Sequence, residues 1–136
     1  MPNTIKLEIV TPHATVYSEE VDMVTLPGID GQMGILRHHI RLMTQLVPGE
    51  MIVRKNGQVR FLAVGEGLVE VTADRVAIVT DMAIATENID EARAEEARRR
   101  AAARLRERIS SAEVASVNAA LARSLAQLRV KRRHSR

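Results

Sequence analysis

MIVRKNGQVRFLAV, residues 51–64, carries the clearest structural signal in the sequence. Two runs rich in β-branched and aromatic residues flank the dipeptide Asn56-Gly57. Asn and Gly readily adopt the positive φ angles that both central positions of a type I′ turn require. The segment therefore predicts two antiparallel strands joined by a two-residue turn.

Similar patterns lie on both sides of this hairpin. Near the start of the chain Ile5, Leu7 and Ile9 alternate with charged residues, as in a strand with one buried face. Residues 15–27, TVYSEEVDMVTLP, form a second run that ends at a Pro-Gly turn signal. Residues 67–81 repeat the hairpin pattern, with apolar residues on both arms: Val69, Val71, Val76 and Ile78. Short strands with turns at these intervals are typical of a β-sandwich or flattened barrel.

After Asp81 the apolar pattern changes to a helical period. Asn88 is predicted to cap a first helix, because Glu91 stands three residues later, as in a capping box. The predicted apolar face of this helix is Ala97, Ala101, Leu105 and Ile109. Ser110 or Ser111 is predicted to cap a second helix. Its predicted apolar seam is Val114, Val117, Leu121, Leu125 and Leu128. The two helices are expected to form an antiparallel hairpin.

The helical hairpin has little apolar surface to offer the rest of the chain. Burying an alanine methyl removes little area from water, at ~25 cal/mol per Å². A hairpin with alanines on one arm and Val and Leu on the other can pair with itself, but we do not expect it also to bind a β domain tightly. The basic tail, residues 130–136, is expected to fray. A helical hairpin that docks weakly on the β domain is expected to change its position relative to that domain.

Charge divides the chain near residue 88. Residues 1–88 carry seven basic and eleven acidic side chains, a net charge of −4. Residues 89–136 carry thirteen basic and six acidic side chains, a net charge of +7. The sequence thus predicts a β-sandwich domain over residues 1–88 and a helical domain over residues 89–136. The basic domain favours a polyanion or an acidic protein surface as partner.

Composition excludes several classes of protein and site. The chain has no Cys, which removes disulfide frameworks and cysteine-based metal or redox centres. Its N-terminus lacks a charged stretch followed by a long apolar run, so we expect no signal peptide. No window approaches the ~18 apolar residues of a membrane span.

Five motifs occur in order along the chain: LEIVTP at 7–12, GQMGIL at 31–36, FLAVGEGLVEV at 61–71, IDEARA at 89–94 and LAQLRV at 125–130. In this order and spacing the chain resembles the epsilon subunit of bacterial F-type ATP synthase. The resemblance implies an α+β fold in which a ten-stranded β-sandwich, or flattened barrel, precedes an antiparallel two-helix hairpin. The residue patterns lead to the same architecture.

The resemblance also implies a function. Members of this family are non-catalytic central-stalk, or rotor, subunits of the proton-translocating ATP synthase. Their sandwich contacts the gamma subunit and the c-ring and couples ring rotation to ATP synthesis. Their C-terminal helices either fold onto the sandwich or extend toward the alpha and beta subunits, where they inhibit ATP hydrolysis. We therefore expect a peripheral membrane protein on the cytoplasmic side of the bacterial inner membrane, held there by its complex, with no required cofactor.

IDEARA resembles the nucleotide-binding signature of those members that bind regulatory ATP. The signature falls on Ile89, Asp90, Arg93 and Ala94. Arg100 matches a further arginine that approaches the phosphates. Arginine offers a fixed set of donors to phosphate, and a carboxylate accepts hydrogen bonds from a ribose or base.

One position departs from that signature. Members that bind ATP carry a glutamate where this chain has Ile84, so any affinity for ATP is expected to be weak. The same residues also fit a helix cap, a first turn matched to the helix dipole and a solvated pair such as Glu96–Arg100. Both interpretations stay open on the sequence.

By the same resemblance, Asp30, Gln32 and His39 lie in a loop that faces the c-ring. Relatives usually carry a glutamate at the position of Gln32 and Pro-Gly-His at the position of Arg37-His38-His39. The loop is thus more basic here, which predicts more acidic partner loops. The adjacent histidines point to opposite faces of an extended segment and no Cys completes a site, so no metal site is expected.

Two other classes of function fit the sequence less well. A nucleic-acid-binding module would use the arginine-rich helices, but one Tyr and one Phe leave few stacking platforms for bases. A small ATP-sensing enzyme would need a nucleophile or general base. The sequence contains no P-loop, no serine elbow and no close acid pair, so no catalytic residues are expected.

Overall fold

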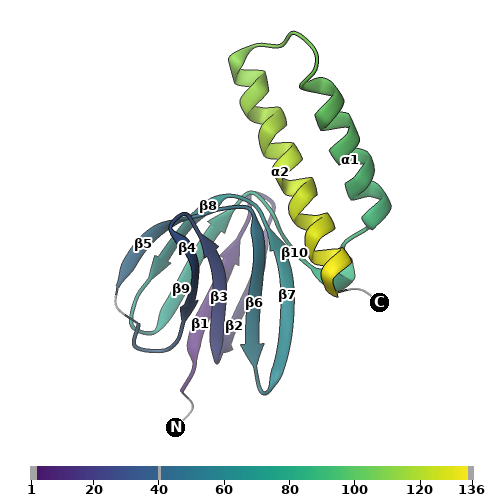
Figure 1. Ribbon diagram of the computed structural model, residues 1–136. Helices are drawn as coiled ribbons and strands as arrows, with labels where there is room; N and C mark the ends of the chain where they lie inside the picture. Colours follow the sequence, from purple (N-terminus) through teal and green to yellow (C-terminus); the bar gives the residue numbers. More distant parts are fainter. Residues whose placement is uncertain (1–2, 40, 135–136) are drawn as a thin grey trace.

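The computed structural model describes residues 3–39 and 41–134 (Figure 1). Within these residues, ten strands precede one short 3-10 helix and two α-helices. Their bounds are β1 Ile5–Val10, β2 Thr15–Val21, β3 Met23–Gly28, β4 Gly31–Ile35, β5 Leu42–Leu46, β6 Gly49–Lys55, β7 Gln58–Val64, β8 Gly67–Val71, β9 Arg75–Thr80, β10 Ala83–Ala85, η1 Thr86–Asn88, α1 Glu91–Arg104 and α2 Ser111–His134.

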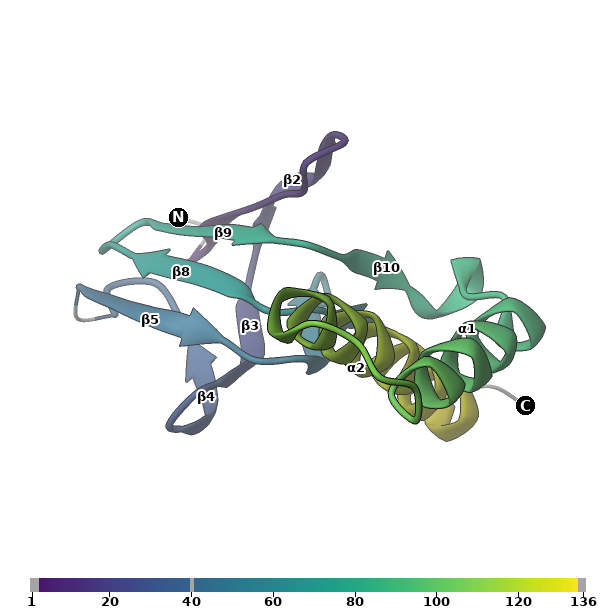
Figure 2. The ribbon, with the colours of Figure 1, turned by 90° about the horizontal axis from the view of Figure 1, so that it is seen from above.

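The strands form one ten-stranded sheet in the order β10-β7-β6-β3-β5-β8-β9-β1-β2, with β4 paired to β3 beside this path. β1 runs parallel to β9, while β6 and β7 pair antiparallel along their whole length. The sheet curls on itself until β2 contacts β6, which gives a nearly closed sandwich (Figures 1 and 2). The predicted fold of a ten-stranded β-sandwich followed by two helices is confirmed.

The core is aliphatic and follows the alternation in the sequence. Ile5, Leu7 and Ile9 are 0% exposed, as their spacing predicts. Further fully buried side chains come from strands β2 to β9: Val21, Val24, Leu26, Ile35, Leu46, Met51, Val53, Val64, Val69, Val76 and Ile78. This apolar filling holds the sheet closed and gives the helices a rigid base.

The predicted β6–β7 turn is confirmed in detail. Asn56 and Gly57 have φ angles of 53° and 77°, and Lys55 pairs with Gln58 across the turn. Asp22 adds a contact that the sequence pattern does not show, because its Oδ2 accepts a hydrogen bond from the Asn56 N–H at 2.9 Å. Asp22 also divides the run at residues 15–27 into the separate strands β2 and β3.

Helix α1 begins two residues later than the capping pattern predicts. Asn88 ends the 3-10 helix η1, and Asp90 is the N-cap of α1, where its Oδ1 accepts from the Arg93 N–H at 3.1 Å. The predicted Asn88 cap is therefore wrong. Ser110 does cap α2, since its hydroxyl accepts from the Glu113 N–H at 3.2 Å.

The apolar seam of α2 differs from the expected one at its C-terminal end. Leu128 is buried as predicted, but Leu125 is 41% exposed. Ser124 and Ala126 are buried instead, because α2 packs on α1 and on the sandwich with different faces.

The basic tail also differs from the expectation. The predicted fraying is wrong for residues 130–134, which continue α2 as a helix, and Val130 is 0% exposed. The rest of the tail, residues 135–136, lies outside the described residues. Over residues 3–39 and 41–134, neither helix combines the length and the hydrophobicity needed to cross a membrane.

Candidate functional site

The candidate site is the junction at which the helical hairpin meets the sandwich. The C-terminal half of α2 lies along β6 and β7 and beside η1, whereas α1 packs mainly against α2 (Figures 1 and 2). The buried apolar part of the junction is small: Ala63, Ile89, Ala126 and Val130, with Phe61, Met82 and Ile84 packed around it. The hairpin is thus held by part of one helix.

Polar contacts fasten one side of this junction. Arg123 donates from Nη1 to Oδ2 of Asp81 at 3.0 Å. One helical turn further along, the amide of Gln127 lies 3.0 Å from the sulfur of Met82. Lys131 Nζ donates to the carbonyl oxygen of Thr86 at 3.2 Å. These contacts connect three successive turns of α2 to the segment between β9 and α1.

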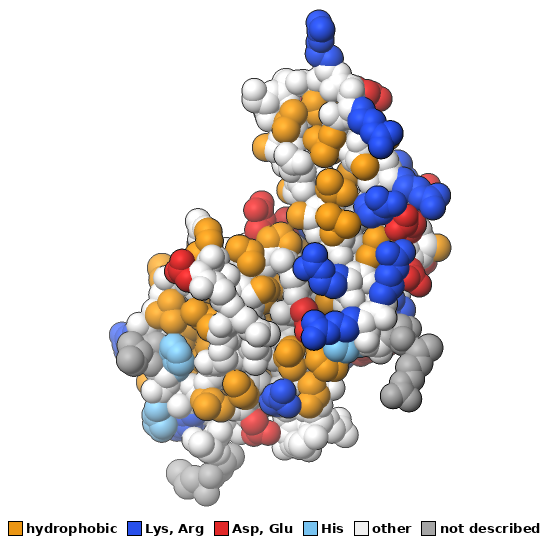
Figure 3. Space-filling model, viewed as in Figure 1, with side chains coloured by type: hydrophobic (Ala, Val, Ile, Leu, Met, Phe, Trp, Pro, Cys, Tyr) orange, Lys and Arg blue, Asp and Glu red, His pale blue; other side chains and the backbone are white. Residues whose placement is uncertain are grey.

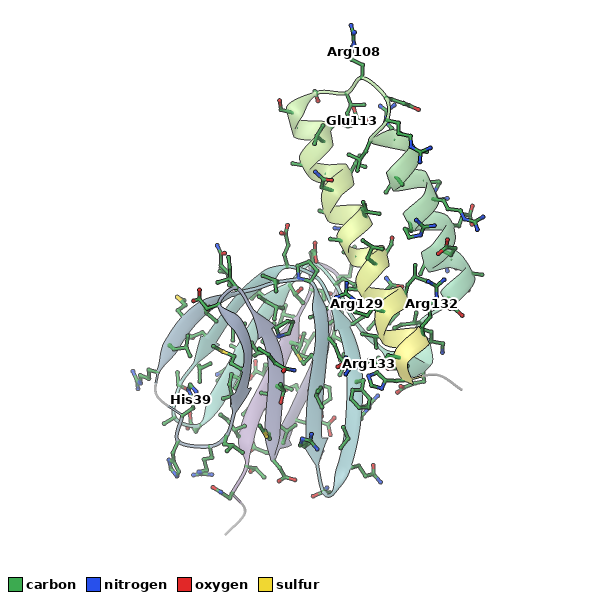
Figure 4. All side chains as sticks on the ribbon, viewed as in Figure 1. His39, Arg108, Glu113, Arg129, Arg132 and Arg133 are labelled. Atoms are coloured by element: carbon green, nitrogen blue, oxygen red, sulfur yellow. The ribbon has the colours of Figure 1, made fainter. Side chains whose placement is uncertain are left out.

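A second cluster fastens the end of α2. The ring of His134 stacks on Phe61, with centroids 3.6 Å apart and planes 7° apart. His134 Nε2 also pairs with Oε1 of Glu50, a carboxylate whose side chain is only 13% exposed. Arg133 approaches the second oxygen of the same carboxylate at 3.5 Å. Figure 4 shows Arg133 at the point where α2 meets the sandwich.

A hollow of about 410 Å³ opens between the start of α1 and the middle of α2. Its walls hold the sequence-predicted residues Asp90, Arg93 and Arg100, together with Ile84. The other lining residues are Asn88, Ala94, Glu96, Ala97, Ser124 and Gln127. The fold therefore brings most of the predicted nucleotide-site residues to one place. Ile89 is the exception, since it is 4% exposed and packs into the junction below the hollow.

The arginines of this hollow differ in their pairing. Arg100 lies 3.4 Å from the Glu96 carboxylate, an exposed i,i+4 pair. The Arg93 guanidinium has no ion pair among residues 3–39 and 41–134. A guanidinium at the wall of a hollow, without a protein carboxylate, is suited to an anionic group of a ligand.

Ion pairs also join the two helices. Arg132 of α2 donates to Glu91 at 2.8 Å and to Glu95 at 3.3 Å. Hydrogen bonds from Arg98 lower the pKa of Glu95 to about 2. Glu95 is thus ionised across the physiological range and bridges α1 and α2.

The residues predicted to face a c-ring do not share one loop. Asp30 lies in the turn between β3 and β4, and Gln32 lies in β4 opposite Pro27. His39 follows the far end of β4, where the neighbouring His38 N–H donates to the carbonyl of Ala73. The expectation of a common loop is wrong, because residues 31–35 form strand β4 between them.

Sequence reasoning missed the long-range contacts that hold α2 on the sandwich, among them Arg123–Asp81 and His134–Glu50. Asp81 and Arg123 are 42 residues apart, and Glu50 and His134 are 84 apart, so no local pattern connects them. One signal was available at Gly65, since a Cβ built there would lie 1.8 Å from Oδ1 of Asp81. A glycine at such a position indicates a close approach. No group of three metal-binding side chains occurs within residues 3–39 and 41–134.

Two family models match consecutive parts of the chain. Residues 4–86 match the β-sandwich domain of the ATP synthase delta/epsilon chain, and residues 87–132 match its long α-helix domain. Among similar proteins, the ATP synthase epsilon chain of Herpetosiphon aurantiacus is 44% identical over 126 residues, 93% of each chain. Epsilon chain 2 of Syntrophotalea carbinolica is 44% identical over 137 residues, covering 100% of this chain and 99% of its own.

Chains of two solved ATP synthase structures share the fold. A chain of the Euglena gracilis mitochondrial ATP synthase, in an OSCP/F1/c-ring structure, matches with a TM-score of 0.71 and 26% identity, over 90% of this chain and 78% of that one. A chain of the Tetrahymena thermophila central stalk and c-ring shares the fold with a TM-score of 0.64 at 13% identity. With both domains matched and relatives above 40% identity over nearly their whole length, the chain belongs to the ATP synthase delta/epsilon chain family as an epsilon chain, a non-catalytic subunit of the F-type enzyme.

Proposed function

We propose that this chain works as a rotor subunit that couples c-ring rotation to ATP synthesis, and that its helical hairpin leaves the sandwich to inhibit ATP hydrolysis. The observation that carries the proposal is the mode of attachment. The hairpin is held to the sandwich by the C-terminal half of α2, while α1 packs mainly on α2. The two helices can therefore move away together without exposing the core of the sandwich.

The size of the junction supports a reversible attachment. Its buried apolar residues are two alanines, Ile89 and Val130. Burying a Val or Ile side chain contributes about 1.5–3 kcal/mol, and an alanine contributes much less. The partly exposed Arg123–Asp81 pair adds up to about 1 kcal/mol. New contacts on the alpha and beta subunits can offset the loss of an apolar junction of this size.

The basic side of the hairpin favours those subunits as its partners in the released state. Lys and Arg side chains gather over the helices in Figure 3. Arg108 points away from the hairpin tip (Figure 4). Complementary charge speeds encounter and fixes orientation, so acidic surfaces on alpha and beta would receive this face.

The outer face of the sandwich offers a surface for the gamma subunit. Val10, Leu68 and Val79 are 36%, 56% and 59% exposed and lie opposite one another on β1, β8 and β9. An apolar row of this kind on three adjacent strands is typical of a surface that a partner covers. We assign it to gamma because the Euglena match lies in an assembly with the catalytic head.

The c-ring is assigned to the side formed by β4. Within the described residues β4 hydrogen-bonds to β3 alone, so its second edge faces outward. Asp30 and Gln32 stand at one end of this strand and His39 follows the other end. Binding to the ring on this side would hold the chain at the cytoplasmic surface of the bacterial inner membrane as a peripheral protein.

The test is ATP hydrolysis by a head of alpha, beta and gamma subunits that lacks its own epsilon subunit. The full chain and residues 1–88 alone are each added, and their binding to the head is measured separately. We expect both to bind and only the full chain to slow hydrolysis. Binding without inhibition by the full chain would contradict the brake, and failure of both to bind would contradict the rotor assignment.

We further propose that the hollow at Arg93 is a weak regulatory site for ATP. Its support is the convergence of Asp90, Arg93 and Arg100 on one hollow and the unpaired Arg93 guanidinium among the described residues. Ile84 places an apolar group in the wall, so we expect a Kd on the order of 1 mM, or about −4 kcal/mol.

Calorimetric titration of the isolated chain with ATP tests this site. Arg93→Ala should reduce the affinity about tenfold, as expected for the loss of a charge-assisted contact. Arg106→Ala is the matched control, because Arg106 is exposed beyond the end of α1. Equal binding by both variants would place ATP elsewhere.

A further inference from the structure

A thioether lies in the junction between the hairpin and the sandwich. Met82 follows β9 and precedes β10, and its side chain packs against the small buried apolar cluster of the junction. The amide nitrogen of Gln127, from α2, lies 3.0 Å from its sulfur. The Met82 sulfur is thus in contact with an apolar cluster and with a polar group of the hairpin at the same time.

The backbone around Met82 is fixed by hydrogen bonds. The Gly65 N–H donates to the Met82 carbonyl oxygen at 2.9 Å. The Met82 N–H donates to the hydroxyl of Thr80, a residue that is 3% exposed, at 3.4 Å. A larger or more polar side chain at position 82 must therefore be accommodated by side-chain rotation or by displacement of α2.

Peroxides oxidise methionine thioethers to sulfoxides. The sulfur lone pair attacks one oxygen of hydrogen peroxide, the O–O bond breaks, and the products are a sulfoxide and one molecule of water. The thioether loses two electrons and the peroxide gains them. Methionine sulfoxide reductases reverse the oxidation, so the change is not a permanent lesion.

A sulfoxide at Met82 would oppose docking on either side of the sulfur. On the side of the apolar cluster, the new oxygen would be a buried polar group without a partner, which is costly. On the side of Gln127, the 3.0 Å between sulfur and amide nitrogen leaves no room for another atom. In the released chain, by contrast, the sulfoxide oxygen reaches water.

We propose that Met82 is an oxidation site, and that its sulfoxide holds the hairpin off the sandwich. Release of the hairpin exposes the sulfur to peroxide, and the oxidised side chain then opposes docking. Peroxide therefore shifts the chain toward the released form. The inference rests on the proposed function to the extent that the hairpin undocks from the sandwich.

Site-specific thiol labelling of the full chain tests the proposal, because the chain contains no Cys. Ala126→Cys places a thiol in the buried junction, where Ala126 is 3% exposed, and Ser116→Cys places a reference thiol on an exposed position of α2. Each thiol is blocked as a mixed disulfide, the chain is treated with hydrogen peroxide, and a phosphine then frees the thiol for labelling. A second sample passes through the same steps without peroxide.

The ratio of the two labelling rates reports how often the junction opens. We expect peroxide to raise the relative rate at position 126 about three- to tenfold. Mass spectrometry of the same samples should find a sulfoxide at Met82 before one at Met51, which is 0% exposed.

Variants assign this response to one sulfur. Met82→Leu keeps an apolar side chain of similar volume that peroxide does not oxidise, so its relative rate should not respond. Met43→Leu is the matched control, because it removes a methionine that is 70% exposed on β5, and it should leave the response unchanged. Met82→Gln places a polar group in the junction and should raise the relative rate without peroxide.

Three results would overturn the inference while a mobile hairpin stands. Peroxide could raise the relative rate equally in Met82→Leu, or leave it unchanged in a chain that carries the Met82 sulfoxide. Met82 could also stay unoxidised under conditions that oxidise Met51.

A different result would count against the proposed function as well. If the thiol of Ala126→Cys in the untreated chain reacts as slowly as that of Val69→Cys in the sandwich core, the junction opens only with global unfolding. The hairpin would then not be mobile, and Met82 would have no released state to stabilise.

Discussion

Arg123 and Asp81 connect the middle of α2 to the start of the linker that leads to α1, through a hydrogen-bonded ion pair of 3.0 Å. Asp81 Oδ1 is buried without a hydrogen-bond partner in the described structure, so the pairing of the carboxylate depends on Arg123 at Oδ2. An ionised group that loses its only charged partner in a partly buried site is costly. The pair therefore holds the hairpin in its docked position and makes that position sensitive to substitution at either end.

Reversing one charge of this pair should favour the released hairpin. Asp81→Arg places two guanidinium groups together, and we expect a loss of about 1–3 kcal/mol of docking free energy. If the released hairpin is the brake, this variant should inhibit ATP hydrolysis by the alpha, beta and gamma head more strongly than the parent chain.

The exchanged pair Asp81→Arg with Arg123→Asp is the control for that prediction. It restores opposite charges and should return inhibition toward the parent level. Stronger inhibition in the exchanged pair than in the single variant would show that the charges at these positions act elsewhere.

Gly65→Ala should destabilise the folded chain. The added Cβ would lie 1.8 Å from Asp81 Oδ1, so the carboxylate must move and its contact with Arg123 is lost. We expect a decrease of about 1–3 kcal/mol in the free energy of unfolding, measured in urea. In an Asp81→Ala background the same substitution should cost clearly less, because the clashing atoms are gone.

Glu95 should make the helical hairpin sensitive to strong acid. Arg98 holds the pKa of Glu95 at about 2, below the ordinary value of 4.5, so the ionised form stabilises the folded state. This contribution is fully present above about pH 4.5 and is lost as the pH falls toward 2. Helix content followed by circular dichroism should therefore decline in this window.

Glu95→Gln should flatten that decline, since an amide does not titrate. Glu96→Gln is the matched control, because the exposed Glu96 carboxylate reaches only Arg100 among the described residues, at 3.4 Å. If both variants keep the full decline, other carboxylates control the acid response of the helices.

Val130→Ala should weaken docking far more than Leu125→Ala. Val130 is 0% exposed and packs with Ala63, whereas Leu125 is 41% exposed. Removing two buried methyl groups costs about 1–3 kcal/mol, and truncating an exposed Leu costs about 0.5 kcal/mol or less. Both effects on docking can be measured by thiol labelling. The rate at which a thiol reagent labels an Ala126→Cys thiol in the buried junction is divided by the rate for a Ser116→Cys thiol on an exposed position of α2. Equal effects would contradict the docked last turn of α2.

The local elements of this protein follow from its sequence. Alternation at Ile5, Leu7 and Ile9 and the Asn56-Gly57 turn are short-range features whose physics involves only neighbouring residues. The change to a helical period is also local, but it does not mark the boundary, because strand β10 (Ala83–Ala85) follows Asp81 and α1 begins at Glu91. Asp90, Arg93 and Arg100 were assigned to a nucleotide site through the family resemblance alone, and the fold places all three on the wall of one hollow.

The tertiary structure alone decided how the hairpin is held. The cap moved from Asn88 to Asp90 because η1 packs against β7 and takes Asn88 out of the helix. The basic residues at the end of α2 predict a frayed tail. In the structure His134 stacks on Phe61 and pairs with Glu50, two residues that folding brings from far upstream, and these contacts fix the tail. No local sequence pattern predicts a pair such as Asp81 and Arg123. The interaction energy of such a pair depends on the burial of the two side chains and the distance between them, which folding sets. Periodicity therefore determined the elements, and long-range burial determined which of their surfaces meet.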